Sequence, residues 1–380
     1  MSNTPESRRA GAVLSIDLDA LADNWRLFRD LCAPSKAEAA AVVKACAYGL
    51  GVDRAAPALM QAGCKTFFVA SIDEAIELRS ILGPAPTIHV FYGLMEGAER
   101  DFVEFDLIPV LNTLGEVGAW RAFCLGFGKS LPCDLHIDTG MSRLGLDDQE
   151  LTSLVDNPDQ LDGLNLNMAM SHLASAEEAD NPSNAQQLGK FQAALKHINP
   201  THASLANSSG TFLGPDYHFD LVRPGIALYG SNPTPDQPNP MAQVIRLQAK
   251  VLQVRTIDTR QGVGYGSTYQ AVPGARLATI AAGYADGYPR RLSNTGDVYF
   301  GEFRAPVVGR VSMDLLTVDV SQVPEPLCRP GQLADLIGPL NSIDDVADKA
   351  ATIGYELLTQ LGSRYHRVYA QVNTGGIQTS

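Results

Sequence analysis

Short apolar runs alternate with longer amphipathic stretches over the first two-thirds of the sequence. Eight of these runs, between residues 39 and 230, have the length of buried strands: AAAVVK, KTFFVAS, TIHVFYG, LIPVLN, CDLHID, LNLNMAMSH, HASLANS and FDLVRPGIALYG. Strands that alternate with helices favour a parallel sheet, and eight of them are typical of a β/α barrel. We therefore predict an eight-stranded α/β barrel of the TIM type, with a doubly wound open sheet as the alternative. In a barrel, the chemistry would lie at the C-terminal strand ends.

Two of the amphipathic stretches carry clear helix signals. Ser71 and Glu74 in SIDEAIELRSIL have the spacing of a capping box. Before the first apolar run, large apolar residues repeat at helical spacing; they are Leu18, Leu21, Trp25 and Phe28.

The pattern changes at SNPTPDQPNP, residues 231–240, where four prolines forbid continuous helix or central strand. Beyond this segment, short alternating runs separated by turns predict a mainly β second domain. A helix from about Ser342 through ELLTQLG is expected to close it. We predict a barrel domain at 10–235 and a β-rich domain at 241–380.

Charge and composition exclude several classes of function. The 380 residues have a formal net charge of −13, which disfavours nucleic acid and anionic membranes as partners. The six cysteines form no CxxC pair and fit a reducing compartment. Neither a signal peptide nor an apolar stretch of about 18 residues is evident. We expect a soluble cytoplasmic protein with a small-molecule ligand and no metal site.

Lys44 ends the first apolar run and is followed by AYGLG. A lysine in this position either extends its amine to solvent or is held where desolvation lowers its pKa toward a nucleophilic amine. Tyr48 and two glycines directly after the strand favour an active-site position.

At this point the sequence resembles a known family. VVKACAYGLG is similar to the pyridoxal-phosphate lysine motif of alanine racemases, enzymes of fold type III. Lys44 and Tyr48 match that motif, whereas Cys46 and Leu50 stand where the family has asparagine and histidine. The resemblance extends over nearly the whole chain and implies that Lys44 holds pyridoxal 5'-phosphate covalently.

The segment HIDTGMSRLG resembles the next family motif. Taken alone, Arg143 is typical of a solvated surface arginine. The resemblance implies that it orients the substrate and contacts the cofactor, for which its planar fork of donors is suited. His136 departs from the family, in which many members carry a carbamate-modified lysine that anchors this arginine.

Further motifs imply the rest of the cofactor site. His172, which alone is typical of a core histidine, would lie against the pyridine ring, and Arg223 would face the pyridine nitrogen. A charged guanidinium there makes the ring a weaker electron sink, which favours racemisation over transamination. The phosphate would be bound by residues of LANSSG and VRPGIALYG, namely Asn207, Ser208, Gly225 and Ile226.

The second domain would complete the site. Tyr265 in GVGYGSTYQA, alone a plausible hairpin tyrosine, matches the family's second base, which family members place at the partner subunit's barrel. A head-to-tail homodimer with shared active sites is therefore implied. The resemblance also implies that Met313 binds the substrate carboxylate and that Tyr369 binds the phosphate. Three further residues would lie at the entrance, namely Tyr284, Arg290 and Arg310.

The resemblance implies two-base racemisation of L- and D-alanine by Lys44 and Tyr265, supplying D-alanine for peptidoglycan. Serine or a broader substrate range stays open, because a pocket discriminates one small group by only about 1–3 kcal/mol. A decarboxylase of the same fold is disfavoured, because its Cys-Glu-Ser-x-Asp pattern does not occur. A non-enzymatic cofactor carrier is disfavoured by residues 241–380 and Tyr265.

Overall fold

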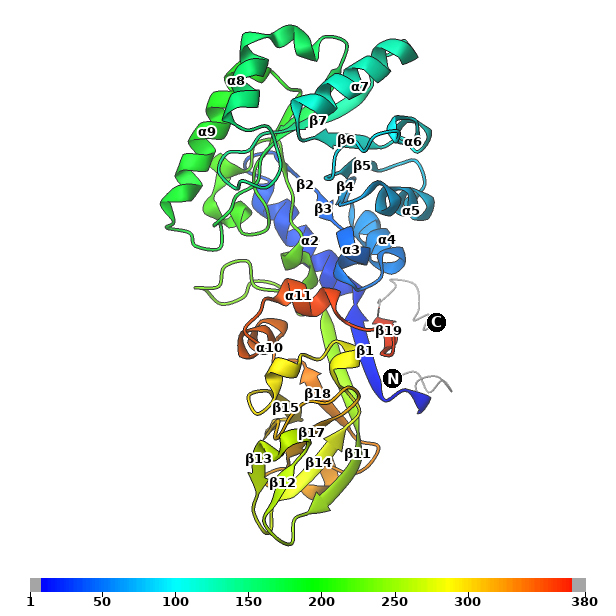
Figure 1. The fold of residues 1–380 in the computed structure, drawn as a ribbon, viewed down its shortest axis with the longest axis vertical. Coiled ribbons are helices and arrows are strands. Elements are labelled where there is room, and N and C mark those ends of the chain that lie inside the picture. The colour runs from blue at the N-terminus through cyan, green and yellow to red at the C-terminus, as the bar shows by residue number, and fades with distance from the viewer. Residues whose placement is uncertain (1–7, 371–380) are drawn as a thin grey trace.

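A curled parallel sheet forms the core of the upper part of the molecule in Figure 1, a computed structural model that describes residues 8–370. Its seven strands follow one another in chain order. They are β3 (Ala41–Val42), β4 (Thr66–Val69), β5 (Thr87–Val90), β6 (Ile108–Leu111), β7 (Pro132–His136), β8 (Asn165–Met170) and β9 (His202–Ser204).

An eighth strand position closes this sheet into a barrel. β10 (Leu221–Val222) pairs in parallel with β2 (Glu38–Ala39), which is separated from β3 by Ala40 alone. On the other side, the Asp220 N–H donates to the Ala203 carbonyl at 3.1 Å. The predicted barrel is thus confirmed, and the open-sheet alternative is excluded.

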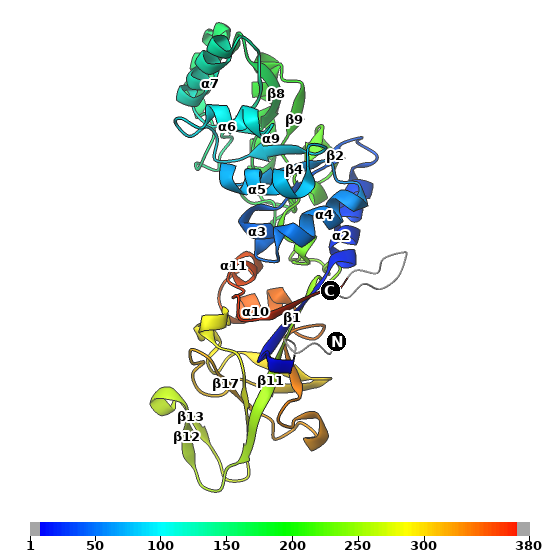
Figure 2. The ribbon, with the colours of Figure 1, turned by 90° about the vertical axis from the view of Figure 1, so that its right-hand side faces the viewer.

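Helices surround the barrel as the amphipathic stretches predicted (Figures 1 and 2). They are α2 (Leu18–Cys32), α4 (Val52–Ala62), α5 (Ile72–Leu82), α6 (Glu99–Glu104), α7 (Leu114–Phe127), α8 (Asp148–Asp156) and α9 (Pro182–Ile198). Ser71 caps α5 in a capping box with Glu74, as predicted. The four apolar residues identified on α2 are all buried.

A mainly antiparallel sheet forms the lower part, in the order β16-β15-β18-β11-β1-β19, and β14 joins β11 to β17. Its strands are β1 (Ala12–Asp17), β11 (Ile245–Thr256), β14 (Arg276–Ile280), β15 (Asp297–Phe300), β16 (Phe303–Pro306), β17 (Leu316–Asp319), β18 (Leu333–Ile337) and β19 (His366–Ala370). β12 (Gln261–Val263) and β13 (Tyr269–Ala271) form a separate hairpin. The predicted β-rich second domain is confirmed, and β1 from the chain's beginning lies within its sheet, between β11 and β19.

Two short helices, and not the single predicted one, lie between the barrel and the lower sheet (Figures 1 and 2). α10 (Ile343–Lys349) and α11 (Gly354–Thr359) are separated by a turn in which Ala351 has φ 54°. A left-handed residue interrupts the right-handed helix. The break lets α11 face the C-terminal ends of the barrel strands.

Candidate active site

The backbone directly after Lys44 is left-handed. Four consecutive residues of α3 (Lys44–Tyr48) have positive φ, namely Ala45 (52°), Cys46 (54°), Ala47 (54°) and Tyr48 (54°). We call residues 45–48 the left-handed turn. This conformation costs about 1–2 kcal/mol for each residue with a Cβ. Contacts from other parts of the fold must therefore hold it.

The end of the left-handed turn is held by aromatic stacking and by the C-terminal strand. The ring of Tyr48 stacks on Tyr229 with centroids 4.5 Å apart. Arg367 of β19 donates to the Gly49 carbonyl at 2.5 Å. Gly49 is required here, because a Cβ would lie 2.5 Å from the Leu358 carbonyl oxygen of α11.

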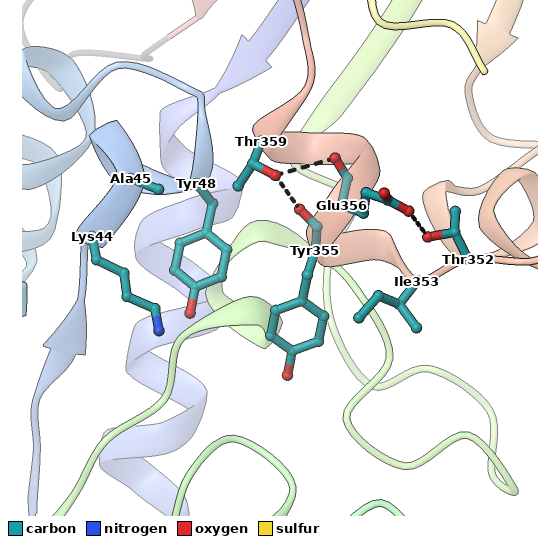
Figure 3. A pocket seen from close by; sticks show the side chains of 8 residues that line it. All are labelled: Lys44, Ala45, Tyr48, Thr352, Ile353, Tyr355, Glu356 and Thr359. Atoms are coloured by element: carbon teal, nitrogen blue, oxygen red, sulfur yellow. Dashed lines mark hydrogen bonds between the residues drawn. The ribbon is translucent and has the colours of Figure 1, made fainter. Parts of the chain in front are cut away.

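A cavity of about 330 Å³ opens at the C-terminal ends of the barrel strands. Most of the cofactor residues predicted from the sequence line it: Lys44, Tyr48, Arg143, His172, Asn207, Ser208, Arg223, Gly225 and Ile226. Tyr355 and Ile353 line it from the start of α11. In Figure 3, which shows the adjoining pocket, the side chains of Lys44, Tyr48 and Tyr355 extend in the same direction.

Arg223 is the buried cation of this cavity. Its side chain donates to the Ser204 hydroxyl and to the Ser171 carbonyl, the latter at 2.5 Å. Burial lowers its pKa to about 9, against the opposing effect of Asp134, so it stays charged at neutral pH. Its Nε is also buried, yet it has no hydrogen-bond partner among residues 8–370. The cavity thus holds an unused donor suited to an acceptor nitrogen.

Hydroxyl groups and backbone amides gather around Gly225. The Ser208 hydroxyl accepts from the Gly225 N–H at 2.9 Å. A Cβ at Gly225 would lie 2.3 Å from the Tyr48 hydroxyl, so only glycine lets the phenol approach the backbone so closely. Donors concentrated in this way suit an anionic group such as a phosphate.

Lys44 is desolvated rather than extended into solvent. Its side chain is half-buried, and Nζ lies 5.9 Å from the centre of the Phe91 ring. Burial and the charge of Arg143 lower its pKa, while Glu74 acts in the opposite direction. Of the two possibilities left open by the sequence, the structure favours the reactive amine.

Both histidines identified in the sequence are neutral. Burial, followed by the charges of Arg223 and Arg143, lowers the pKa of His172 well below its usual value. Burial and Arg223 lower the pKa of His136 to about 4. Unlike His172, His136 is not among the residues that line the cavity.

The predicted residues of the β-rich part lie outside this cavity within one chain. Tyr265, Tyr284 and Met313 are 73%, 43% and 53% exposed. Their loops pack together, because the Tyr284 N–H donates to the Ser312 carbonyl at 3.1 Å and a Cβ at Gly266 would lie 3.2 Å from the Arg310 guanidinium. Arg290 is also exposed. Figures 1 and 2 show β12 and β13, which flank Tyr265, toward the lower end of the molecule, whereas α3 lies near its middle, above α11.

Tyr369 does not reach the cavity either. Its hydroxyl donates to the Leu50 carbonyl at 2.8 Å, and Arg54 covers its ring at 5.1 Å. Strand pairing with β1 fixes this direction. Besides Tyr48, the tyrosine that lines the cavity is Tyr355 and not Tyr369, in contrast to the sequence prediction. The sequence marks Tyr355 only by its position, directly after Gly354 at the start of a helix, and this position does not indicate a role in the site.

The cavity suits a molecule with an anionic group for the donors around Gly225, an acceptor nitrogen for Arg223 Nε, and a carbonyl that reacts with an amine. Pyridoxal 5'-phosphate has all three groups. The fold and the site thus define a barrel enzyme that depends on this cofactor. Residues 16–233 match the alanine racemase N-terminal domain and residues 244–369 the C-terminal domain, so the chain belongs to the alanine racemase family.

Individual relatives agree over nearly the full length. An alanine racemase from Rhodospirillum rubrum is 50% identical over 97% of this chain and 99% of its own. One from Mesorhizobium japonicum, described as catabolic, is 46% identical over 95% and 93%. The crystal structure of alanine racemase from Bartonella henselae with covalently bound pyridoxal phosphate has a TM-score of 0.91 and 43% identity, and covers 95% of this chain and 100% of that one. The chain is an isomerase that racemises alanine with pyridoxal 5'-phosphate.

Proposed function

We propose that racemisation uses two bases, Lys44 of one subunit and Tyr265 of its partner, in a homodimer with shared active sites. The observation that carries this proposal is the separation of the two groups: Lys44 lines the cavity, whereas Tyr265 is 73% exposed in the other part of the same chain. A second copy is needed to bring an equivalent tyrosine to the lysine.

Racemisation needs a proton acceptor and a proton donor on opposite faces of the substrate's α-carbon. The bound cofactor supplies the electron sink that makes the α-proton acidic. The Lys44 amine accepts the α-proton of D-alanine, and burial, which lowers its pKa, favours the unprotonated amine that this step requires. Tyr265 of the partner subunit exchanges the proton on the other face.

The cationic groups Arg143 and Arg223 orient the substrate and the cofactor. We assign the substrate carboxylate to Arg143, with the backbone N–H of Met313 from the partner subunit. Arg223 remains charged and disfavours a second positive charge at the cofactor's ring nitrogen, while neutral His172 contacts the ring. The phosphate would be bound by the four residues that the sequence predicts, namely Asn207, Ser208, Gly225 and Ile226. We assign Tyr355 to the phosphate as a fifth residue. Tyr284, Arg290 and Arg310 form the entrance.

The product serves, in this proposal, as D-alanine for peptidoglycan in the cytoplasm. No helix within residues 8–370 has the length and apolar character needed to cross a membrane. Serine is the alternative substrate, since it differs from alanine by one hydroxyl group. Incubating the enzyme with single L-amino acids and quantifying each D-form by chiral chromatography separates these substrates.

Replacing Lys44 by Ala tests the central assignment. We expect loss of the absorbance band of covalently held cofactor and of racemisation, whereas replacing exposed Lys129 by Ala leaves both unchanged. A Lys44→Ala protein that retained the band and turned over normally would refute the assignment.

A further inference from the structure

Glu74 connects helix α5 to the left-handed turn. Its Oε1 accepts from the Ala45 N–H at 2.7 Å, directly after Lys44. Its Oε2 accepts from the Ala70 N–H at 2.8 Å and from the Ser71 N–H at 3.4 Å. The two oxygens therefore make different contacts. Oε2 accepts from the N–H groups at the start of helix α5, and Oε1 accepts from the backbone directly after Lys44.

Three N–H groups converge on this one side chain, and none of them can accept a hydrogen bond. A carboxylate meets all three, because both of its oxygens are acceptors. Glutamine has the same shape but would turn an NH₂ group toward at least one of these donors. The arrangement thus requires the ionised acid and not merely a polar residue of this length.

The Ala45 contact lies at the start of the left-handed turn. Ala45 is the first of the four left-handed residues, and the turn determines in which direction the strand end delivers Lys44. We propose that Glu74 is a positioning residue for Lys44: it holds the Ala45 N–H, fixes the start of the left-handed turn and so directs the lysine amine into the cavity. This inference rests on the proposed role of Lys44 as cofactor lysine and base.

The charge of Glu74 adds a measurable signature. The charged and titratable groups around Lys44 are Glu74 from α5, Arg143 after β7, His172 after β8 and Tyr48 from α3. Its pockets are also lined by Glu177, Arg223, Tyr355 and Glu356. Glu74 raises the pKa of Lys44, against burial and Arg143. Removing its charge should therefore lower that pKa further.

The test uses Glu74→Gln, with Ser71→Ala as the matched control. Ser71→Ala removes the cap hydrogen bond from the Glu74 N–H to the Ser71 hydroxyl and leaves the Ala45 contact intact. Lys44 is acetylated with acetic anhydride in cofactor-free protein over a range of pH, and the modified peptide is quantified by mass spectrometry. This readout measures the Lys44 amine directly and does not depend on whether Lys44 holds the cofactor. A negative result would therefore reject the role of Glu74, whereas a negative Lys44→Ala experiment would reject the role of Lys44 as cofactor lysine.

For Glu74→Gln, we expect the acetylation midpoint to fall by about 0.5 pH unit or more. We also expect kcat to fall about tenfold with little change in KM, because a displaced base slows the proton transfer. The Ser71→Ala protein should show neither effect. Equal changes in both variants, or no change in Glu74→Gln, would overturn the proposal.

A second variant separates geometry from charge. Glycine adopts φ near +52° without the steric penalty of alanine. Adding Ala45→Gly to Glu74→Gln should recover at least part of the lost kcat but not the shifted acetylation midpoint. If the double variant stayed as slow as Glu74→Gln, strain in the turn would not be what Glu74 controls, and the positioning role would be rejected.

Discussion

The imidazole Nδ1 of His136 lies 2.8 Å from the side-chain oxygen of Asn112. The amide of Asn112 is fixed, because its nitrogen donates to the carbonyls of Phe91 and Val110 at 3.1 and 2.9 Å. Its oxygen must therefore accept, and His136 Nδ1 carries the hydrogen. In the neutral ring this leaves Nε2 as an acceptor. Where many family members carry a modified, negatively charged lysine, this chain has a neutral acceptor.

The neutrality of His136 predicts an acid-sensitive contribution to stability. Its pKa is about 4 in the folded protein and about 6.5 when unfolded. Between these values only the unfolded chain binds the proton, so the free energy of unfolding falls as the pH falls through this window, by at most about 3 kcal/mol from this group. Urea unfolding at several pH values should show that the free energy of unfolding of His136→Gln falls less steeply with falling pH than that of the parent protein. Parallel curves for parent and variant would contradict this account.

The proposed shared active sites predict complementation between inactive subunits. Lys44→Ala and Tyr265→Phe proteins should each lose most activity alone. In a mixed dimer, one of the two sites has both native groups. Random exchange of equal amounts should therefore restore up to about one quarter of the parental activity, since about half of the dimers are mixed. If the mixture stayed inactive although exchange was demonstrated by mass spectrometry, the two groups would not act across the dimer.

Gly225→Ala should damage the end of the cavity to which we assign the cofactor phosphate. The new Cβ would meet the Tyr48 hydroxyl at 2.3 Å, and overpacking of this kind costs about 1–3 kcal/mol. We expect weaker binding of pyridoxal 5'-phosphate in fluorescence titrations, and partial recovery when Tyr48→Phe removes the hydroxyl. Gly189→Ala on α9 is the control, because nothing lies within 4 Å of its added Cβ. Unchanged affinity in Gly225→Ala would show that the cofactor does not use this end.

Tyr355 and Tyr369 should differ in what their hydroxyl groups do. Burial raises the pKa of Tyr355, so its hydroxyl stays a donor, and Tyr355→Phe should weaken cofactor affinity by about tenfold. Tyr369→Phe leaves the Leu50 carbonyl without this donor and should lower the free energy of unfolding by about 1 kcal/mol with little effect on affinity. The reverse pattern in affinity and unfolding measurements would restore Tyr369 as the phosphate ligand.

Local sequence patterns were sufficient to predict the strands and helices of the barrel, because burial of one face of each element requires apolar residues at a regular spacing. The capping box at Ser71 and the apolar face of α2 are set by neighbours within a few residues. The convergence of Lys44, Arg223 and Gly225 could likewise be expected, since strand ends of a parallel barrel meet at one rim. Tyr355 was missed because its environment is created by the break between α10 and α11, which depends on packing against the barrel.

The sequence by itself determined the alternation of strands and helices, the β-rich second part and the residue types gathered at the barrel rim, because hydrophobic periodicity and turn chemistry act over short distances. Only the tertiary structure decided that β1 from the beginning of the chain lies between β11 and β19 and that Lys44 is followed by a left-handed turn. It also decided that Glu74 contacts the first residue of that turn and that Arg367 contacts Gly49 directly after it. Such contacts join residues far apart in the chain, and a strained backbone persists only where they are already in place.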